Sequence, residues 1–200
     1  MVPYLPEGTR LFRLFAAHQD WTDRFLVEPS LLSVIDSYGI ELIHPEREGR
    51  SDQQIGKKGY SNRRWIVGGK LCLLLTHLGQ VIDWACDTAN VHDTVFHPLI
   101  QRWDEQTVVF SDHGFHAKDG DPANLKVCQP FELNERMIVE TVLSMLTTIC
   151  HFKKVMHRTW TYFQARLAYT MALFNLLVSW DGFHPDSDGM VHLSIAAFSL

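Results

Sequence analysis

The stretch TVVFSDHGFH, Thr107–His116, predicts the end of a buried strand followed by a turn. β-Branched and aromatic residues crowd Thr107–Phe110, which is typical of a short buried strand. Asp112 follows almost at once, and Gly114 lets the backbone bend after it. In sheets with helices packed on them, ligands gather at such strand ends. The Asp112 carboxylate is therefore a candidate functional group, with capping of the turn as the alternative.

Length and composition predict one main domain. Two hundred residues, 46% of them hydrophobic, can bury one sizeable core. The four cysteines form no CxxC pair, and the N-terminus has no basic-then-apolar leader, so we expect a reduced, cytoplasmic setting. The longest apolar stretch, Tyr162–Trp180, is interrupted by polar residues. We expect it to form a core helix rather than a membrane span.

The net charge of −5 argues against a chain that coats nucleic acid non-specifically. Basic residues nevertheless cluster, with seven against three acidic ones between Glu46 and Lys70. Basic surface beside acidic sites suits an enzyme that handles phosphates, and a solvated charged loop is the alternative. The candidate DNA-binding residues in these clusters are Arg63, Arg64, Lys70, Lys153, Lys154 and Arg158.

Hydrophobic periodicity predicts an α/β fold, with a mixed sheet flanked by helices. In chain order we expect a helix over Glu7–Leu26, a strand over Leu31–Ile35, a charged loop over His44–Asn62, a hairpin of two long strands over Arg63–Ala89, a helix over His92–Trp103, the strand before Asp112, a short strand near Val127 and a helix over Asn134–Ile149.

Three carboxylates stand out against this layout. Asp36 and Asp112 follow predicted strands, and Glu140 lies on the helix after them, one turn from Arg136. Each acid alone has an ordinary explanation, as a turn cap or as a surface ion pair. Together they can converge on hard cations, which prefer oxygen ligands.

From about Leu31 to Trp180 the chain resembles the catalytic domain of DDE-type transposases encoded by bacterial insertion sequences, which has the RNase H-like fold. The resemblance rests on segments in a fixed order: VIDSYG around Asp36, the predicted hairpin, TANVHD, SDHGF around Asp112, and NERMIVETVLSML with Arg136 and Glu140. It implies a helical segment over 1–28 as a remnant of a DNA-binding region, an RNase H-like domain over 29–180 and a tail over 181–200.

The resemblance implies that Asp36, Asp112 and Glu140 are the catalytic triad. They would hold two divalent ions, Mg²⁺ or Mn²⁺, about 4 Å apart. The reaction would be cleavage at transposon ends followed by strand transfer into target DNA, in a homodimer assembled on DNA. Arg136 would contact DNA as part of the signature around the last acid.

Two departures from the family pattern keep alternatives open. Leu133 and Thr147 replace a Tyr and a basic residue of the signature, and only a short segment precedes Asp36, so we expect a truncated copy. The alternatives are a remnant that binds DNA or a protein without catalysis, and a metal-dependent nuclease on the same fold.

Overall fold

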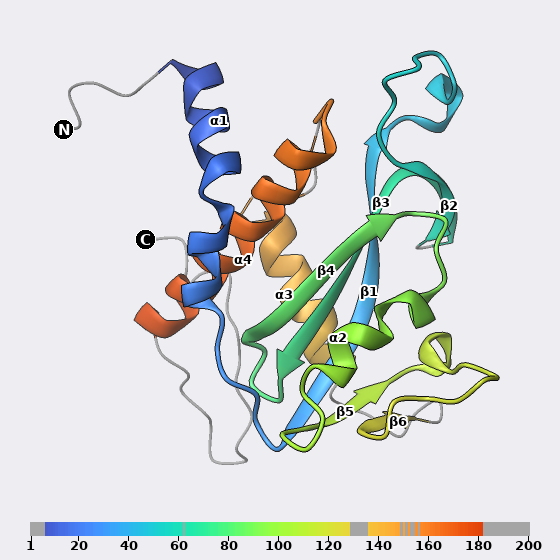
Figure 1. The fold of residues 1–200 in the computed structure, drawn as a ribbon, viewed down its shortest axis with the longest axis vertical. Helices are drawn as coiled ribbons and strands as arrows, with labels where there is room; N and C mark the ends of the chain where they lie inside the picture. Colours follow the sequence, from blue (N-terminus) through green and yellow to red (C-terminus); the bar gives the residue numbers. More distant parts are fainter. Residues whose placement is uncertain are drawn as a thin grey trace.

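The structure, a computed structural model, describes residues 7–61, 63–128, 136–148, 150, 152, 155 and 157–181. One mixed sheet organises the chain (Figure 1). Its strands are β1 (Leu32–Ile43), β2 (Lys57–Ser61), β3 (Arg64–Thr76), β4 (Val81–Thr88), β5 (Val108–Ser111) and β6 (Leu125–Val127). Along the sheet the order is β2, β3, β1, β5 and β6, with β4 also paired to β3. The predicted mixed α/β architecture is therefore confirmed.

Strand direction changes within the sheet at β1. This strand pairs antiparallel with β3 on one side and parallel with β5 on the other, and β5 continues parallel to β6. The predicted hairpin is β3 and β4, joined by a tight turn in which the Thr76 amide donates to the Gln80 carbonyl at 2.9 Å. Gly79 takes a φ of +90° in that turn, which a glycine adopts without strain.

Two predicted boundaries are wrong. The first strand does not end before Asp36 but continues to Ile43, because β3 is long enough to pair with it as far as Ile43. Within the predicted charged loop, Lys57–Ser61 forms β2, which pairs with the first residues of β3. Both segments are rich in polar residues and glycine, and β3 supplies the backbone partners that their composition does not suggest.

The helical elements lie mainly on the two faces of the sheet. They are α1 (Gly8–Ala17), α2 (His97–Gln101), α3 (Arg136–Thr148) and α4 (Trp160–Asp181), with 3-10 turns η1 (Gln19–Phe25), η2 (Pro45–Arg47), η3 (Asp93–Phe96) and η4 (His113–Phe115). The helix predicted over Glu7–Leu26 is divided at His18, after which the chain continues as η1.

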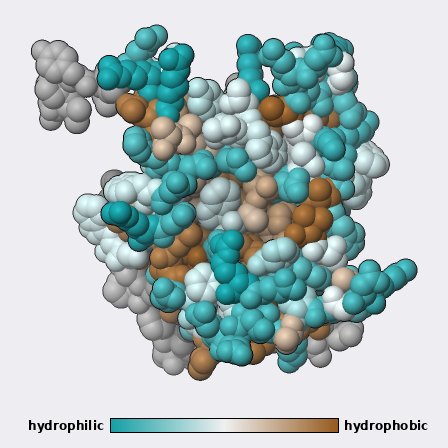
Figure 2. Space-filling view, viewed as in Figure 1, coloured by the Kyte–Doolittle hydropathy of each residue, from teal (hydrophilic) through white to brown (hydrophobic). Residues whose placement is uncertain are grey.

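The sheet separates two cores. On one face α3 and α4 pack on residues such as Val34 and Leu73, and on the other α2 packs on Ile35 and Leu74. Successive side chains of β1 and β3 therefore enter opposite cores, as expected for strands that are covered on both faces. Figure 2 shows hydrophobic side chains gathered near the middle of one view of the surface, within hydrophilic surroundings.

The C-terminal half of the chain contributes the core helix that its apolar stretch predicts. Within α4, Phe163, Leu167 and Phe174 are buried, and the polar side chain of Asn175 is buried with them. Its amide nitrogen donates to the carbonyls of Val81 and Phe25 at 2.7 and 2.8 Å, so this polar group is satisfied. Among the helices of the described residues, none has the combined length and hydropathy of a membrane span.

Candidate functional site

The parallel pairing of β1 with β5 places Asp36 and Asp112 on adjacent strands. The last pair in this register is Val34 with Phe110, and two residues further along each strand stand the two aspartates. Both are half-buried. Asp36 lies inside β1, whereas Asp112 follows the last residue of β5. The sequence correctly placed the pair on neighbouring strands, although it ended the first strand too early.

Local hydrogen bonds orient both carboxylates. Oδ1 of Asp36 accepts from the Ser37 amide at 2.7 Å. Oδ1 of Asp112 accepts from the Gly114 amide at 2.9 Å, which caps η4. Asp112 is therefore also the turn cap that the sequence suggested as its ordinary explanation.

A third acid, Asp93, belongs to this region and was not among the predicted site residues. A Cβ on Gly114 would lie 2.7 Å from Oδ2 of Asp93 and 2.9 Å from Oδ1 of Asp112. The two oxygens are therefore separated by no more than the sum of these distances. Glycine at position 114 is what allows both carboxylates to approach the same stretch of backbone.

Asp93 is held by a polar network that joins three segments. Its Oδ1 accepts from Ser37 Oγ at 2.6 Å and from Lys70 Nζ at 3.0 Å, and Lys70 also donates to the Val91 carbonyl at 2.7 Å. The Lys70 side chain is only 12% exposed and that of Asp93 21%. Its burial and its ion pair with Asp93 do not favour the predicted contact of Lys70 with DNA.

The buried thiol of Cys72 lies in the field of these acids. Burial is the largest cause that raises the pKa of this thiol. The carboxylates of Asp36 and Asp93 raise the pKa further, and the Lys70 ammonium lowers it. The protonated thiol is therefore the stable form, and Cys72 is a packing residue rather than a nucleophile.

Glu140 lies on α3 with an exposed side chain. The residues that α3 buries are on its other side and include Val139, Val142 and Leu146. Asp36 lies on the sheet face that α3 covers, since its partner on β3, Leu73, packs in the same core. The register places the two aspartates level on neighbouring chain segments, the Glu140 side chain is exposed on α3, and the convergence of the three carboxylates stays a prediction.

Two carboxylates suit a divalent cation, because hard cations prefer oxygen ligands. In the part of the chain that the structure describes, however, no three His, Cys, Asp or Glu side chains are grouped as a metal site. The ligand set of Asp36, Asp112 and Glu140 stays a prediction, with its two aspartates in compatible places.

The predicted DNA-binding residues are distributed over several elements. Arg63 is exposed at the turn between β2 and β3, and Arg64 is exposed with its guanidinium 3.4 Å from Glu41. Arg158 is exposed before α4. The backbone of Arg136 begins α3, but its side chain, like Lys153 and Lys154, lies outside the described residues.

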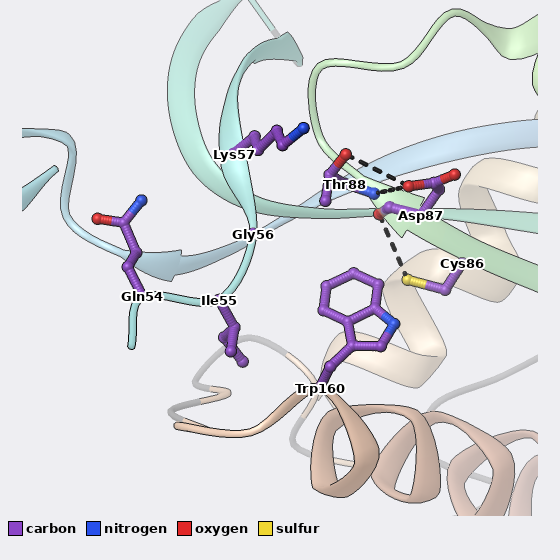
Figure 3. Close-up of a pocket in the computed structure, with 8 residues that line it drawn as sticks. All are labelled: Gln54, Ile55, Gly56, Lys57, Cys86, Asp87, Thr88 and Trp160. Carbon is purple, nitrogen blue, oxygen red and sulfur yellow. Dashed lines mark hydrogen bonds between the residues drawn. The ribbon is translucent and has the colours of Figure 1, made fainter. Parts of the chain in front are cut away.

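An open pocket of about 500 Å³ lies beside the last residues of β4, at the end of the β3–β4 hairpin that is remote from its turn (Figure 3). Its lining residues are Gln54, Ile55, Gly56, Lys57, Cys86, Asp87, Thr88 and Trp160. Asp87 accepts from the Thr88 amide, and burial together with Asp87 raises the pKa of Cys86 to about 12. The pocket therefore offers no reactive thiolate at neutral pH.

No protein-family model matches this chain, and no curated protein or solved structure shows a significant match to it. Sequence reasoning missed Asp93, although its segment TANVHD is one of those that carry the transposase resemblance. A signal for Asp93 was present in the sequence. It is an acid that begins a helical segment shortly after the predicted hairpin, where its side chain can return to the sheet.

Proposed function

We propose that this chain is a metal-dependent phosphodiester transferase that acts on DNA, of the DDE transposase class, with an RNase H-like fold. The mixed sheet covered by helices on both faces supports the fold. The observation that carries the function is the level placement of two half-buried aspartates, Asp36 and Asp112, on adjacent parallel strands.

In this proposal the chain's own residues hold and orient the reacting groups. Asp36 and Asp112 would bind divalent cations, and the Ser37 and Gly114 amides keep the two carboxylates in position. Bound cations would supply charge stabilisation for the attacking and leaving oxygens of the phosphodiester. Because this chemistry needs only positioning and charge, the protonated thiols of Cys72 and Cys86 do not oppose it.

Glu140 is the part of the proposal that the fold supports least. Completion of the ligand set requires the exposed side of α3 to approach the two aspartates. This observation favours the second candidate, a remnant that binds DNA without cutting it. The two candidates differ in one measurable property, which is cleavage.

The test is Mg²⁺-dependent cleavage of the DNA that flanks the coding sequence. Asp112→Asn keeps the side-chain shape and an oxygen for the Gly114 amide but removes the charge that a cation needs. The matched control is Asp119→Asn, an exposed loop acid two residues before Asp121. We expect the parent and the control to cleave and Asp112→Asn to lose cleavage while it stays folded. Equal cleavage by Asp112→Asn would contradict the catalytic role, and no cleavage by the parent would favour the remnant.

A further inference from the structure

The β2–β3 hairpin carries two exposed aromatic side chains that the core does not use. Tyr60 is 60% exposed and Trp65 is 57% exposed. They form a cross-strand pair in the antiparallel register, with ring centroids 5.5 Å apart and planes at 71°. In such an edge-to-face pair one ring covers only one face of the other, so ring surface remains exposed to a stacking partner.

Positive charge surrounds this aromatic pair. Residues 57–65 contain Lys57, Lys58, Arg63 and Arg64 and no acidic residue. Lys58 Nζ lies 5.8 Å from the centre of the Trp65 ring and 3.1 Å from Glu48. Arg63 is exposed, and within the described residues no carboxylate lies within ion-pair distance of it. Lys57 precedes Lys58 on β2 and therefore lies on the opposite face, where it lines the pocket of Figure 3. The hairpin is therefore a local basic surface on a chain of net negative charge.

The base of the hairpin is held firmly against the sheet. A Cβ on Gly59 would lie 1.9 Å from the Ala89 carbonyl oxygen, so β2 packs directly on the backbone after β4. Ser61 Oγ accepts from the Gly39 amide at 3.1 Å on the neighbouring part of the sheet. The exposed rings thus stand on a preformed support, which lowers the entropy cost of binding.

We propose that Tyr60 and Trp65 stack on unpaired bases of single-stranded DNA, with Lys58 and Arg63 on the phosphates. Aromatic rings stack on bases whose faces are free, and in a duplex those faces are covered. Exposed cations beside exposed rings favour a single-stranded polyanion, since its phosphates attract the cations and its bases can stack on the rings. This inference rests on the proposed function only for DNA as the class of partner, and it adds the strand form that is bound.

The experiment measures binding of the full chain to a labelled oligothymidine and to a mixed-sequence duplex by fluorescence anisotropy. The test variant combines Tyr60→Leu with Trp65→Leu, and the rescue variant combines Tyr60→Phe with Trp65→Phe. The matched control is Trp21→Leu, because Trp21 is 51% exposed and also forms an edge-to-face pair, with Phe25, but between Asp20 and Asp23.

We expect the leucine pair to weaken oligothymidine binding about tenfold or more, with little change for the duplex. The phenylalanine pair and Trp21→Leu should bind the oligothymidine like the parent. Replacing Lys58 and Arg63 with Gln should instead reduce the slope of log affinity against log salt, by about 0.7 for each phosphate that the variant no longer neutralises.

Three results would overturn the inference: unchanged oligothymidine binding by the leucine pair, an equal loss for the duplex, or an equal loss in Trp21→Leu. Its failure is distinguishable from failure of the proposed function, because binding is measured without cleavage.

Discussion

The β1–β5 region and the β2–β3 hairpin belong to one sheet but use their polar residues differently. Around Asp36 and Asp112 the polar groups are half-buried and bond to one another, as Lys70 does with Asp93 at 3.0 Å. On the β2–β3 hairpin the charged groups are exposed, and the two that form ion pairs, Lys58 and Arg64, do so with partly exposed acids. The comparison teaches that the β1–β5 region keeps its polar groups in a fixed geometry, which suits a reacting centre. The β2–β3 hairpin instead presents an open surface, which suits binding of a ligand.

The largest effect on stability should come from the buried ion pair of the acidic region. Lys70→Met leaves the carboxylate of Asp93 only 21% exposed and without its cation. We expect a loss of about 2–3 kcal/mol in the free energy of unfolding, measured by urea denaturation.

Lys57→Met on the hairpin is the control for that measurement, because the Lys57 side chain is exposed. It should change stability by less than about 0.5 kcal/mol. Similar losses in the two variants would remove the energetic distinction between the regions.

The base of the hairpin should be nearly as sensitive, although its surface is open. Gly59→Ala places a methyl group against the Ala89 carbonyl, and overpacking of this kind costs about 1–3 kcal/mol. Gly8→Ala is the matched control, because a Cβ there has no atom within 4 Å. Thermal denaturation should show a lower midpoint for the first variant only. If Gly59→Ala were as stable as Gly8→Ala, the hairpin would not be anchored as described.

A smaller, pH-dependent effect should appear at Cys86, between the two regions. Burial raises the pKa of this thiol from 9.0 to about 12, so the folded state keeps its proton where the unfolded state releases it. Its contribution to stability is complete below pH 9.0 and decreases as the pH rises toward 12. Alkylation followed by mass spectrometry should therefore label Cys86 far more slowly in the folded chain than in the denatured chain. Equal rates would mean that the thiol is accessible and ionised normally.

The smallest effect should be that of an exposed ion pair on the hairpin. Arg64 lies 3.4 Å from Glu41, with side chains 62% and 28% exposed. Arg64→Gln should lower the free energy of unfolding by less than about 0.5 kcal/mol, because solvent screens such pairs. A loss as large as that of Lys70→Met would show that the hairpin charges are structural rather than available to a ligand.

The elements with a clear apolar period could be predicted from the sequence. The β3–β4 hairpin and the core helix α4 are confirmed, because each follows from a long apolar stretch, which β3 buries almost continuously between the two cores and α4 buries in one of them. The extension of β1 beyond Asp36 and the presence of β2 were missed, since polar residues and glycine gain strand structure there only through pairing with β3. Such pairing is non-local and leaves no local pattern.

The candidate site was predictable in part for the same reason. Asp36 and Asp112 were found because each is adjacent to an apolar run, and the parallel register places them level. Asp93 was missed because its partners, Ser37 and Lys70, come from two other strands and meet it only in the folded chain. The exposure of Glu140 depends on how α3 is rotated against the sheet, which its spacing alone did not determine.

The central claim is that Asp36 and Asp112 act as one site, and the most direct test is a double-variant cycle on Mg²⁺-dependent DNA cleavage. Asp36→Asn, Asp112→Asn and the double variant should each lose about a hundredfold or more of the parent's rate, with no further loss in the double variant, because groups that serve one reacting centre are not additive. Losses that multiply in the double variant, or a rate equal to the parent's in either single variant, would contradict the claim.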